Sequence, residues 1–123
     1  MKNRRALIGR LGEEVATRYL CTRGYQVITR NYRQRVGEID IVARTAAGEL
    51  VFCEVKARTG GGYGTPAEAV SVHKQYKIRQ TIKYFRQENE DLAKLSYRLD
   101  VLAIMIDLSN KEAEVEHIKN AFV

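Results

Sequence analysis

The fold is decided at GEIDIVA (37–43) and LVFCEVK (50–56), two apolar β-type runs that each carry charged residues. A strand that only packs would not hold carboxylates and a lysine, because burying an unpaired charge is costly. We therefore interpret these charges as a site built on two neighbouring strands.

The segment between the two runs predicts a hairpin with a three-residue loop. Such loops often end with a glycine in the left-handed conformation, and Gly48 stands at that place after Ala46 and Ala47. A register centred on Ala47 places two pairs of residues opposite each other, namely Asp40 with Glu54 and Glu38 with Lys56. Alternation along each strand then puts all four on one face of the sheet. Two facing acids beside a lysine suit a metal ion and a phosphate, which suggests a nuclease.

Positive charge is concentrated in the first two thirds of the chain. The net charge is +6, but residues 1–87 hold 17 Lys and Arg against 7 Asp and Glu, whereas residues 88–123 hold 4 against 8. A basic surface favours a polyanionic partner, most often nucleic acid, and solubility alone is the alternative explanation. The candidate contacts are Arg33, Arg35, Arg58, Lys74 and Lys77.

Composition excludes several other classes of protein. No apolar run is long enough to span a bilayer, and the apolar residues near the N-terminus are spaced as in a helix rather than grouped as in a signal peptide. Two cysteines, Cys21 and Cys53, are too few for a disulfide framework or a zinc site. We expect a cytoplasmic protein with no membrane partner, and Cys53 in the core.

Hydrophobic periodicity and glycine positions predict seven elements in the order αβββαββ. The helices are expected over residues 5–23 and 71–87, and the strands over 25–32, 36–44, 49–58, 99–108 and 112–118. The inner faces are marked by Ala16 and Leu20 in the first helix and by Ile78, Ile82 and Phe85 in the second. This order implies an α/β fold in which helices flank a mixed central sheet, as one domain over residues 1–123.

Several motifs follow one another along nearly the whole chain. They are Gly12-Glu13-Glu14-Val15-Ala16, Asn31-Tyr32-Arg33, Gly37-Glu38-Ile39-Asp40, Glu54-Val55-Lys56-Ala57-Arg58 and Arg98-Leu99-Asp100-Val101. In this order and spacing the chain resembles the YraN family, bacterial proteins predicted to be endonuclease-like. That family is related to the archaeal Holliday junction resolvases of the PD-(D/E)xK nuclease superfamily, although isoleucine rather than proline precedes Asp40 here.

The resemblance implies a fold, an activity and partners. The fold would have a restriction-endonuclease-like αβββαβ core. The activity would be a metal-dependent endonuclease that hydrolyses phosphodiester bonds in DNA, with branched and single-stranded DNA as the candidate substrates. By analogy with the resolvases the protein would form a homodimer.

The resemblance also implies the residues of the site. Asp40 and Glu54 would hold Mg²⁺ or Mn²⁺, with the Val55 carbonyl completing the shell, and Lys56 would orient a water molecule or offset charge on the phosphate. Glu13 would be a further ligand, direct or through water, reached from the first helix. Its place at the border of the buried helix face allows this, and a merely solvated glutamate is the alternative.

Three neighbouring positions are supporting candidates. Glu38 either binds a second ion or pairs with Lys56 and holds it in place, and we favour the pairing. Lys74 and Gln75 stand near the start of the second helix, where they reach a phosphate or belong to a frayed first turn.

The remaining polar features have simpler interpretations. Arg98 and Asp100 are predicted to form a structural ion pair, and His73 and His117 are isolated in the sequence and are not assigned as ligands. The glycine-rich loop over residues 60–67 is interpreted as a flap beside the site, with Tyr63 either stacking on a base or simply exposed. A dinucleotide-binding loop is rejected because no acidic residue ends a second strand about 20 residues later.

Three functions follow from this sequence. The first is a metal-dependent endonuclease, the second a nucleic-acid-binding module with a nuclease-like fold and no turnover, and the third an accessory protein whose basic face binds an acidic partner. The presence together of Asp40, Glu54 and Lys56 favours the first, since a binding module has little need of all three.

Overall fold

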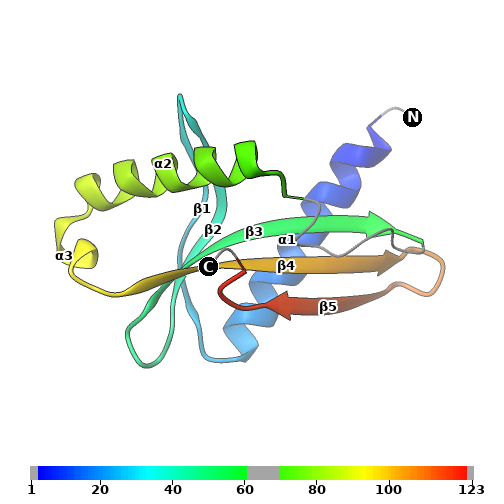
Figure 1. Ribbon diagram of the computed structural model, residues 1–123. Coiled ribbons are helices and arrows are strands. Elements are labelled where there is room, and N and C mark those ends of the chain that lie inside the picture. Colours follow the sequence, from blue (N-terminus) through cyan, green and yellow to red (C-terminus); the bar gives the residue numbers. More distant parts are fainter. Residues whose placement is uncertain (1–2, 61–69, 122–123) are drawn as a thin grey trace.

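The computed structural model describes residues 3–60 and 70–121, which form a five-stranded mixed sheet with helices on both faces (Figure 1). The elements follow in the order α1 (Arg4–Thr22), β1 (Gln26–Gln34), β2 (Gly37–Arg44), β3 (Leu50–Thr59), α2 (Val72–Glu88), α3 (Glu90–Ala93), β4 (Tyr97–Asp107) and β5 (Glu112–Ile118). The strands lie side by side in chain order, and neighbours are antiparallel except for β3 and β4. The predicted α/β class, mixed sheet and αβββαβ order are confirmed, and the sequence did not predict the short α3.

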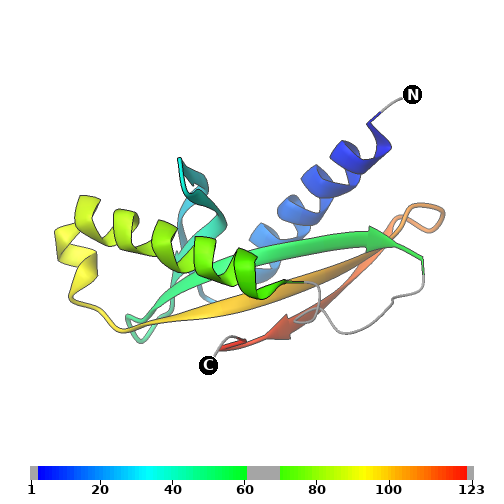
Figure 2. The ribbon, with the colours of Figure 1, turned by 45° about the horizontal axis from the view of Figure 1, so that its top comes forward.

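Helices α1 and α2 pack on opposite faces of the sheet (Figure 2). The α1 face is built from Ala16 and Leu20 against every second residue of the central strands, including Val51 and Cys53. The α2 face uses the alternate residues of the same strands, against the predicted stripe of Ile78, Ile82 and Phe85. The pleat of β3 therefore sorts its side chains between two apolar layers, and Cys53 is in the core as expected. In the described part of the chain no helix is both long and apolar enough to cross a bilayer.

Helix α1 approaches β3 closely at Gly12. A methyl group placed on Gly12 would overlap the Cβ of Ala57, whereas one placed on Gly9 would meet nothing within 4 Å. The absence of a side chain at Gly12 thus sets how near the helix lies to the sheet. This approach matters for the site because Glu13 is the next residue.

Exchanging these two glycines for alanine should change stability in opposite directions. Gly12→Ala should lower the free energy of unfolding by about 1–3 kcal/mol, because overpacking against Ala57 outweighs the gain in helix propensity. Gly9→Ala should raise it by about 0.5–1 kcal/mol, because only the propensity changes. Urea denaturation of both variants measures the difference, and equal stabilisation by the two would show that α1 does not pack tightly at Gly12.

The β2–β3 hairpin has the predicted loop and register. The Thr45 N–H donates to the Glu49 carbonyl at 2.9 Å, the Gly48 N–H donates to the Thr45 carbonyl at 2.9 Å, and Gly48 has a φ of +99°. The strand pairs run from Arg44 with Leu50 to Ile41 with Cys53, which is the register centred on Ala47.

Beyond Ile41 and Cys53 the two strands part. Towards its start β2 remains paired with β1 as far as Gly37, but the described ladder with β3 ends at Cys53. The β1–β2 hairpin instead rises past α2 (Figure 1) and packs there at Gly37, where a Cβ would lie 2.9 Å from Thr81 Oγ1. Extending the observed register would pair Asp40 with Glu54 and Glu38 with Lys56, as predicted. These positions lie beyond the end of the β2–β3 ladder, so the two pairs do not form.

Candidate active site

Asp40 lies where β2 and β3 separate. Its Oδ2 accepts a hydrogen bond of 2.7 Å from the Val55 backbone N–H. The carboxylate thus satisfies a β3 donor that the neighbouring strand no longer reaches, and it fixes Asp40 against β3. Asp40 is thus held between the β1–β2 ladder and the backbone of β3.

Glu54 and two lysines lie together on the α2 face of β3. The Glu54 side chain is 6% exposed, and its Oε2 is 2.8 Å from Lys74 Nζ and 3.7 Å from Lys56 Nζ. Asp40 and Glu54 line one cavity of about 290 Å³, here named the α2 cavity, whose other walls include His73, Lys74 and Lys77. The structure therefore brings the two predicted acids to one space, with a lysine from each of two elements beside Glu54.

Burial and neighbouring charges shift the pKa values of two groups in this cluster. Burial and the nearby Glu54 carboxylate raise the pKa of Asp40 to about 7, although the hydrogen bond from Val55 N–H opposes the change. Burial and the adjacent Lys74 ammonium lower the pKa of Lys56, against the attraction of Glu54. Asp40 shares the α2 cavity with Glu54, whereas Lys56 lies beside Glu54 and lines the cavity of Arg58. Perturbed groups of opposite type around one carboxylate are typical of functional sites.

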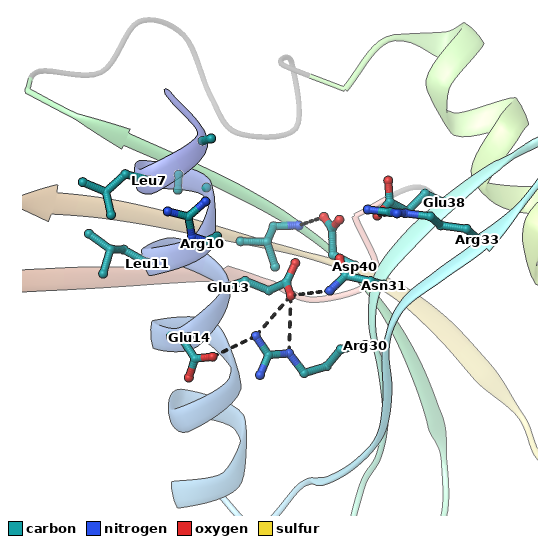
Figure 3. Close-up of a pocket in the computed structure, with 14 residues that line it drawn as sticks. Leu7, Arg10, Leu11, Glu13, Glu14, Arg30, Asn31, Arg33, Glu38 and Asp40 are labelled. Atoms are coloured by element: carbon teal, nitrogen blue, oxygen red, sulfur yellow. Dashed lines mark hydrogen bonds and ion pairs between the residues drawn. The ribbon is translucent and has the colours of Figure 1, made fainter. Parts of the chain in front are cut away.

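Glu13 faces a second cavity on the other side of the sheet. This α1 cavity, about 730 Å³ in volume, has Asp40, Glu13 and Arg10 among its walls. Glu13 Oε1 accepts hydrogen bonds from Arg30 Nη2 at 3.1 Å and from Asn31 Nδ2 at 2.8 Å. Figure 3 shows Glu13 projecting from α1 toward the strands that carry Arg30, Asn31 and Asp40. The structure places Glu13 in one cavity with Asp40, and Glu54 in the other.

The predicted partnership of Glu38 with Lys56 is wrong. Glu38 Oε2 accepts a hydrogen bond from Arg33 Nε at 3.2 Å, whereas Lys56 is near Glu54. The physical reason is the separation of the strands, because Glu38 follows the β1–β2 hairpin away from β3. Glu38 still borders both cavities.

The start of α2 separates the two supporting candidates there. Ser71 caps the helix by accepting from the Lys74 backbone N–H at 3.1 Å. The Lys74 side chain reaches Glu54, but the Gln75 amide donates to the Val70 carbonyl at 3.1 Å. Gln75 therefore holds the entry to α2 and does not reach a phosphate site, and the first turn is not frayed.

The predicted nucleic-acid contacts fall into two groups. Arg33, Arg35 and Lys77 are exposed on the β1–β2 hairpin and on α2, where Lys77 lines the α2 cavity and Arg33 lines the α1 cavity. Arg58 lines a different cavity, whose walls include Glu114 and Glu116 of β5. The glycine loop and Tyr63 lie outside the described residues.

The donors present suit a divalent cation in part. No group of three or more His, Cys, Asp or Glu side chains within residues 3–60 and 70–121 is arranged to hold a metal. Asp40 and Glu54 nevertheless share a cavity, and each raises the energy of the other's charge, a cost that a cation between them would remove. The available set is thus two carboxylates with the adjacent Val55 carbonyl, and oxygen donors of this type are those that Mg²⁺ and Mn²⁺ prefer.

Sequence reasoning missed a polar cluster on the α1 face. His117, taken as isolated, bonds through Nε2 to Asp100 Oδ2 at 2.6 Å and through Nδ1 to the Tyr19 hydroxyl at 3.0 Å. The predicted ion pair of Arg98 with Asp100 is confirmed, with Nε 3.0 Å from Oδ1. No local pattern in the sequence indicates these contacts, because Tyr19 lies 98 residues and Asp100 17 residues before His117.

Comparison with known proteins identifies the family. The model of the uncharacterised protein family UPF0102 matches residues 12–104. A UPF0102 protein of Desulforamulus reducens is 40% identical over 121 residues, covering 98% of this chain and 99% of that protein. Another, of Rhodococcus opacus, is 44% identical over 117 residues, covering 94% and 95%.

Among solved structures, an EndoMS–dsDNA2 complex matches with a TM-score of 0.40 and 16% identity, over 77% of this chain and 35% of that chain. The family match covers Glu13, Asp40, Glu54 and Lys56, and each of the two relatives covers more than nine tenths of this chain. The chain belongs to the uncharacterised protein family UPF0102, the YraN family.

Proposed function

We propose that this protein is a divalent-metal-dependent endonuclease that hydrolyses phosphodiester bonds in DNA, with branched or single-stranded DNA as the substrate. The observation that carries the proposal is the pairing of Asp40 and Glu54 in one cavity with two lysine ammonium groups beside Glu54. Neither acid contributes to an apolar layer, and their mutual repulsion costs folding energy. The simplest explanation is a bound cation that offsets the repulsion between these two carboxylates.

Each residue has a distinct role in this proposal. Asp40, Glu54 and the Val55 carbonyl would hold Mg²⁺ or Mn²⁺, which when bound supplies positive charge to the phosphate and acidifies a water molecule. The Val55 N–H orients Asp40, and Lys74 holds the Glu54 carboxylate in place. Lys56, whose Nζ lies 3.7 Å from Glu54 Oε2, is suited to orient that water molecule or to offset charge on the phosphate.

Glu13 is proposed to act through water. Arg30 and Asn31 fix its Oε1 on the α1 side, where it shares a cavity with Asp40 but not with Glu54. Asn31 has a φ of +55°, a conformation that asparagine tolerates better than most residues. Asn31 and Arg30, the two residues that hold the Glu13 carboxylate, are neighbours in β1.

A nucleic-acid-binding module without turnover is the second candidate. Lys74 Nζ already neutralises Glu54 at 2.8 Å, and this contact supports a site that is stable without metal. In both candidates Arg33, Arg35 and Lys77 would contact phosphates, and each contact should steepen the dependence of affinity on salt by about 0.9 in log–log slope for duplex DNA. Affinity that does not change with salt would favour an acidic protein partner instead.

A Mn²⁺ titration with a cleavage assay separates the two candidates. Glu54→Gln should weaken Mn²⁺ binding measured by calorimetry and abolish cleavage of linear, single-stranded and four-way-junction DNA. Lys56→Ala should leave Mn²⁺ affinity nearly unchanged and lower the cleavage rate by about 10²-fold or more, since it removes a group needed in the transition state.

Lys94→Ala is the control, because Lys94 is exposed after α3 and away from both cavities. It should change neither Mn²⁺ affinity nor rate. If the wild type binds no Mn²⁺ at millimolar concentration, with or without DNA, the enzyme assignment fails and the binding module is retained.

A further inference from the structure

The outer face of α2 combines exposed apolar side chains with positive charge. Residues 72–87 contain five Lys and Arg and no Asp or Glu. The inner side of the helix is buried, and the outer side exposes Val72 by 81%, Tyr76 by 60% and Tyr84 by 43%. These side chains add nothing to the apolar layer beneath the helix. Their exposure therefore calls for another explanation than packing.

The helical spacing groups these residues into one surface. Val72, Tyr76, Arg79 and Lys83 recur at intervals of three and four, so they form a stripe along the helix. His73 and Lys77, which line the α2 cavity, stand three residues before Tyr76 and one residue after it. The first two residues of the stripe, Val72 and Tyr76, thus stand next to residues that line the cavity of Asp40 and Glu54.

We propose that this stripe binds an unpaired strand of nucleic acid, with a base stacked on Tyr76 and the backbone leading into the α2 cavity. The proposal rests on the proposed function, and it specifies the substrate as DNA with single-stranded character at the point of entry. Aromatic rings interleaved with cations are the arrangement that holds single strands, because every base offers a π-face and every nucleotide a phosphate.

The charge of the surface argues against the other occupants. A docking site for an apolar helix would place its exposed aromatic residues among other apolar side chains, whereas Tyr76 stands among cations. A fully paired duplex would use the cations but leave the ring of Tyr76 without a partner, because its bases are already stacked on one another. The surface therefore suits an unpaired strand better than a duplex or a protein.

Binding of a 15-nucleotide oligothymidine and of a 15-base-pair duplex, measured by fluorescence anisotropy in EDTA, tests this. Tyr76→Ala should weaken binding of the single strand about 10-fold and of the duplex less than 2-fold, the usual scale for one lost stacking contact. Tyr76→Phe, which keeps the ring, should stay within 2-fold of the wild type for both. Because Tyr76 is exposed, its replacement should leave stability almost unchanged.

Leu108→Ala is the matched control, since Leu108 is a 38% exposed apolar residue at the turn after β4. It should bind both oligonucleotides as the wild type does. Equal weakening of single strand and duplex by Tyr76→Ala, or no weakening of either, would overturn the proposal, and the second result would leave the surface to a protein partner.

Omission of metal keeps this test independent of cleavage. If Mn²⁺-dependent cleavage occurs while Tyr76→Ala binds the single strand normally, the stacking proposal fails and the enzyme stands. If Tyr76→Ala loses the single strand while the wild type binds no Mn²⁺, the enzyme fails and the strand-binding surface stands.

Discussion

Replacing Asp40 with asparagine should stabilise the protein at pH 8 and at the same time abolish the metal-dependent cleavage that we propose. Asparagine keeps an oxygen that accepts from the Val55 N–H, so the contact across the separated strands survives. It removes the negative charge of Asp40, which burial and the nearby Glu54 carboxylate make unfavourable. It also removes a proposed metal ligand, so activity and stability should change in opposite directions, as is common at functional sites.

The stability gain should depend on pH. The pKa of Asp40 is raised to about 7 in the folded protein, against about 3.9 in an unfolded chain. Its contribution to stability is therefore complete below about pH 4 and is lost as the pH rises through about 7. A shift of this size corresponds to about 4 kcal/mol, and we expect about half of it because water reaches the cavity.

Urea denaturation at pH 3.5 and pH 8 measures this gain. Asp40→Asn should match the wild type within about 0.5 kcal/mol at pH 3.5 and exceed it by about 2 kcal/mol at pH 8. Asp91→Asn, at an exposed position in α3, should show the same small difference at both pH values. An Asp40→Asn protein that is less stable than the wild type at pH 8 would mean that the ionised carboxylate is a favourable structural contact.

Replacing Asp100 with asparagine should cause the largest loss of stability. Asp100 is 0% exposed and accepts from Arg98, His117 and the Asn120 N–H. Burial alone would raise the pKa of Asp100, but these hydrogen bonds outweigh it and hold the pKa below its usual range. Arg98 pairs with two carboxylates, Glu49 at 2.9 Å and the fully buried Asp100 at 3.0 Å. Asparagine would remove the buried partner and leave only Glu49, at a cost of about 3 kcal/mol.

Thermal unfolding of Asp100→Asn measures this cost as a fall in Tm of about 10 °C. Asp107→Asn is the control, because it makes the same change at an exposed position of the same strand, and it should change stability by less than about 0.5 kcal/mol. Cleavage per folded molecule should be unchanged in Asp100→Asn. A well-folded variant without cleavage would instead make the Asp100 cluster part of the active site.

The sequence predicted the elements of the fold well because their causes are local. Gly48 fixed the loop of the β2–β3 hairpin, the spacing of Ile78, Ile82 and Phe85 fixed the inner side of α2, and both are confirmed. The approach of α1 to β3 at Gly12 depends on two residues far apart in the chain, so no local pattern revealed it.

For the candidate site, the sequence predicted that Asp40 and Glu54 lie near each other, but it did not predict most of the side-chain contacts. Counting along the hairpin placed Asp40 and Glu54 on a common face, and they do share a cavity. The count assumed that pairing continues, and it failed for Glu38 because the strands part. The strongest contact of Glu54 is with Lys74 on α2, and only the packing of that helix on the sheet determines it.

Where β2 and β3 separate, one residue, Asp40, is reached from both faces of the sheet. Asp40 borders the α1 cavity and the α2 cavity alike, so a cation that approaches from either side acts on the same carboxylate. Two ligands bound on opposite faces would therefore be thermodynamically linked through one ionisable group, without any movement of the backbone. Such linkage is reciprocal, so whatever occupancy beside Glu13 does to affinity beside Glu54, occupancy beside Glu54 does equally in return.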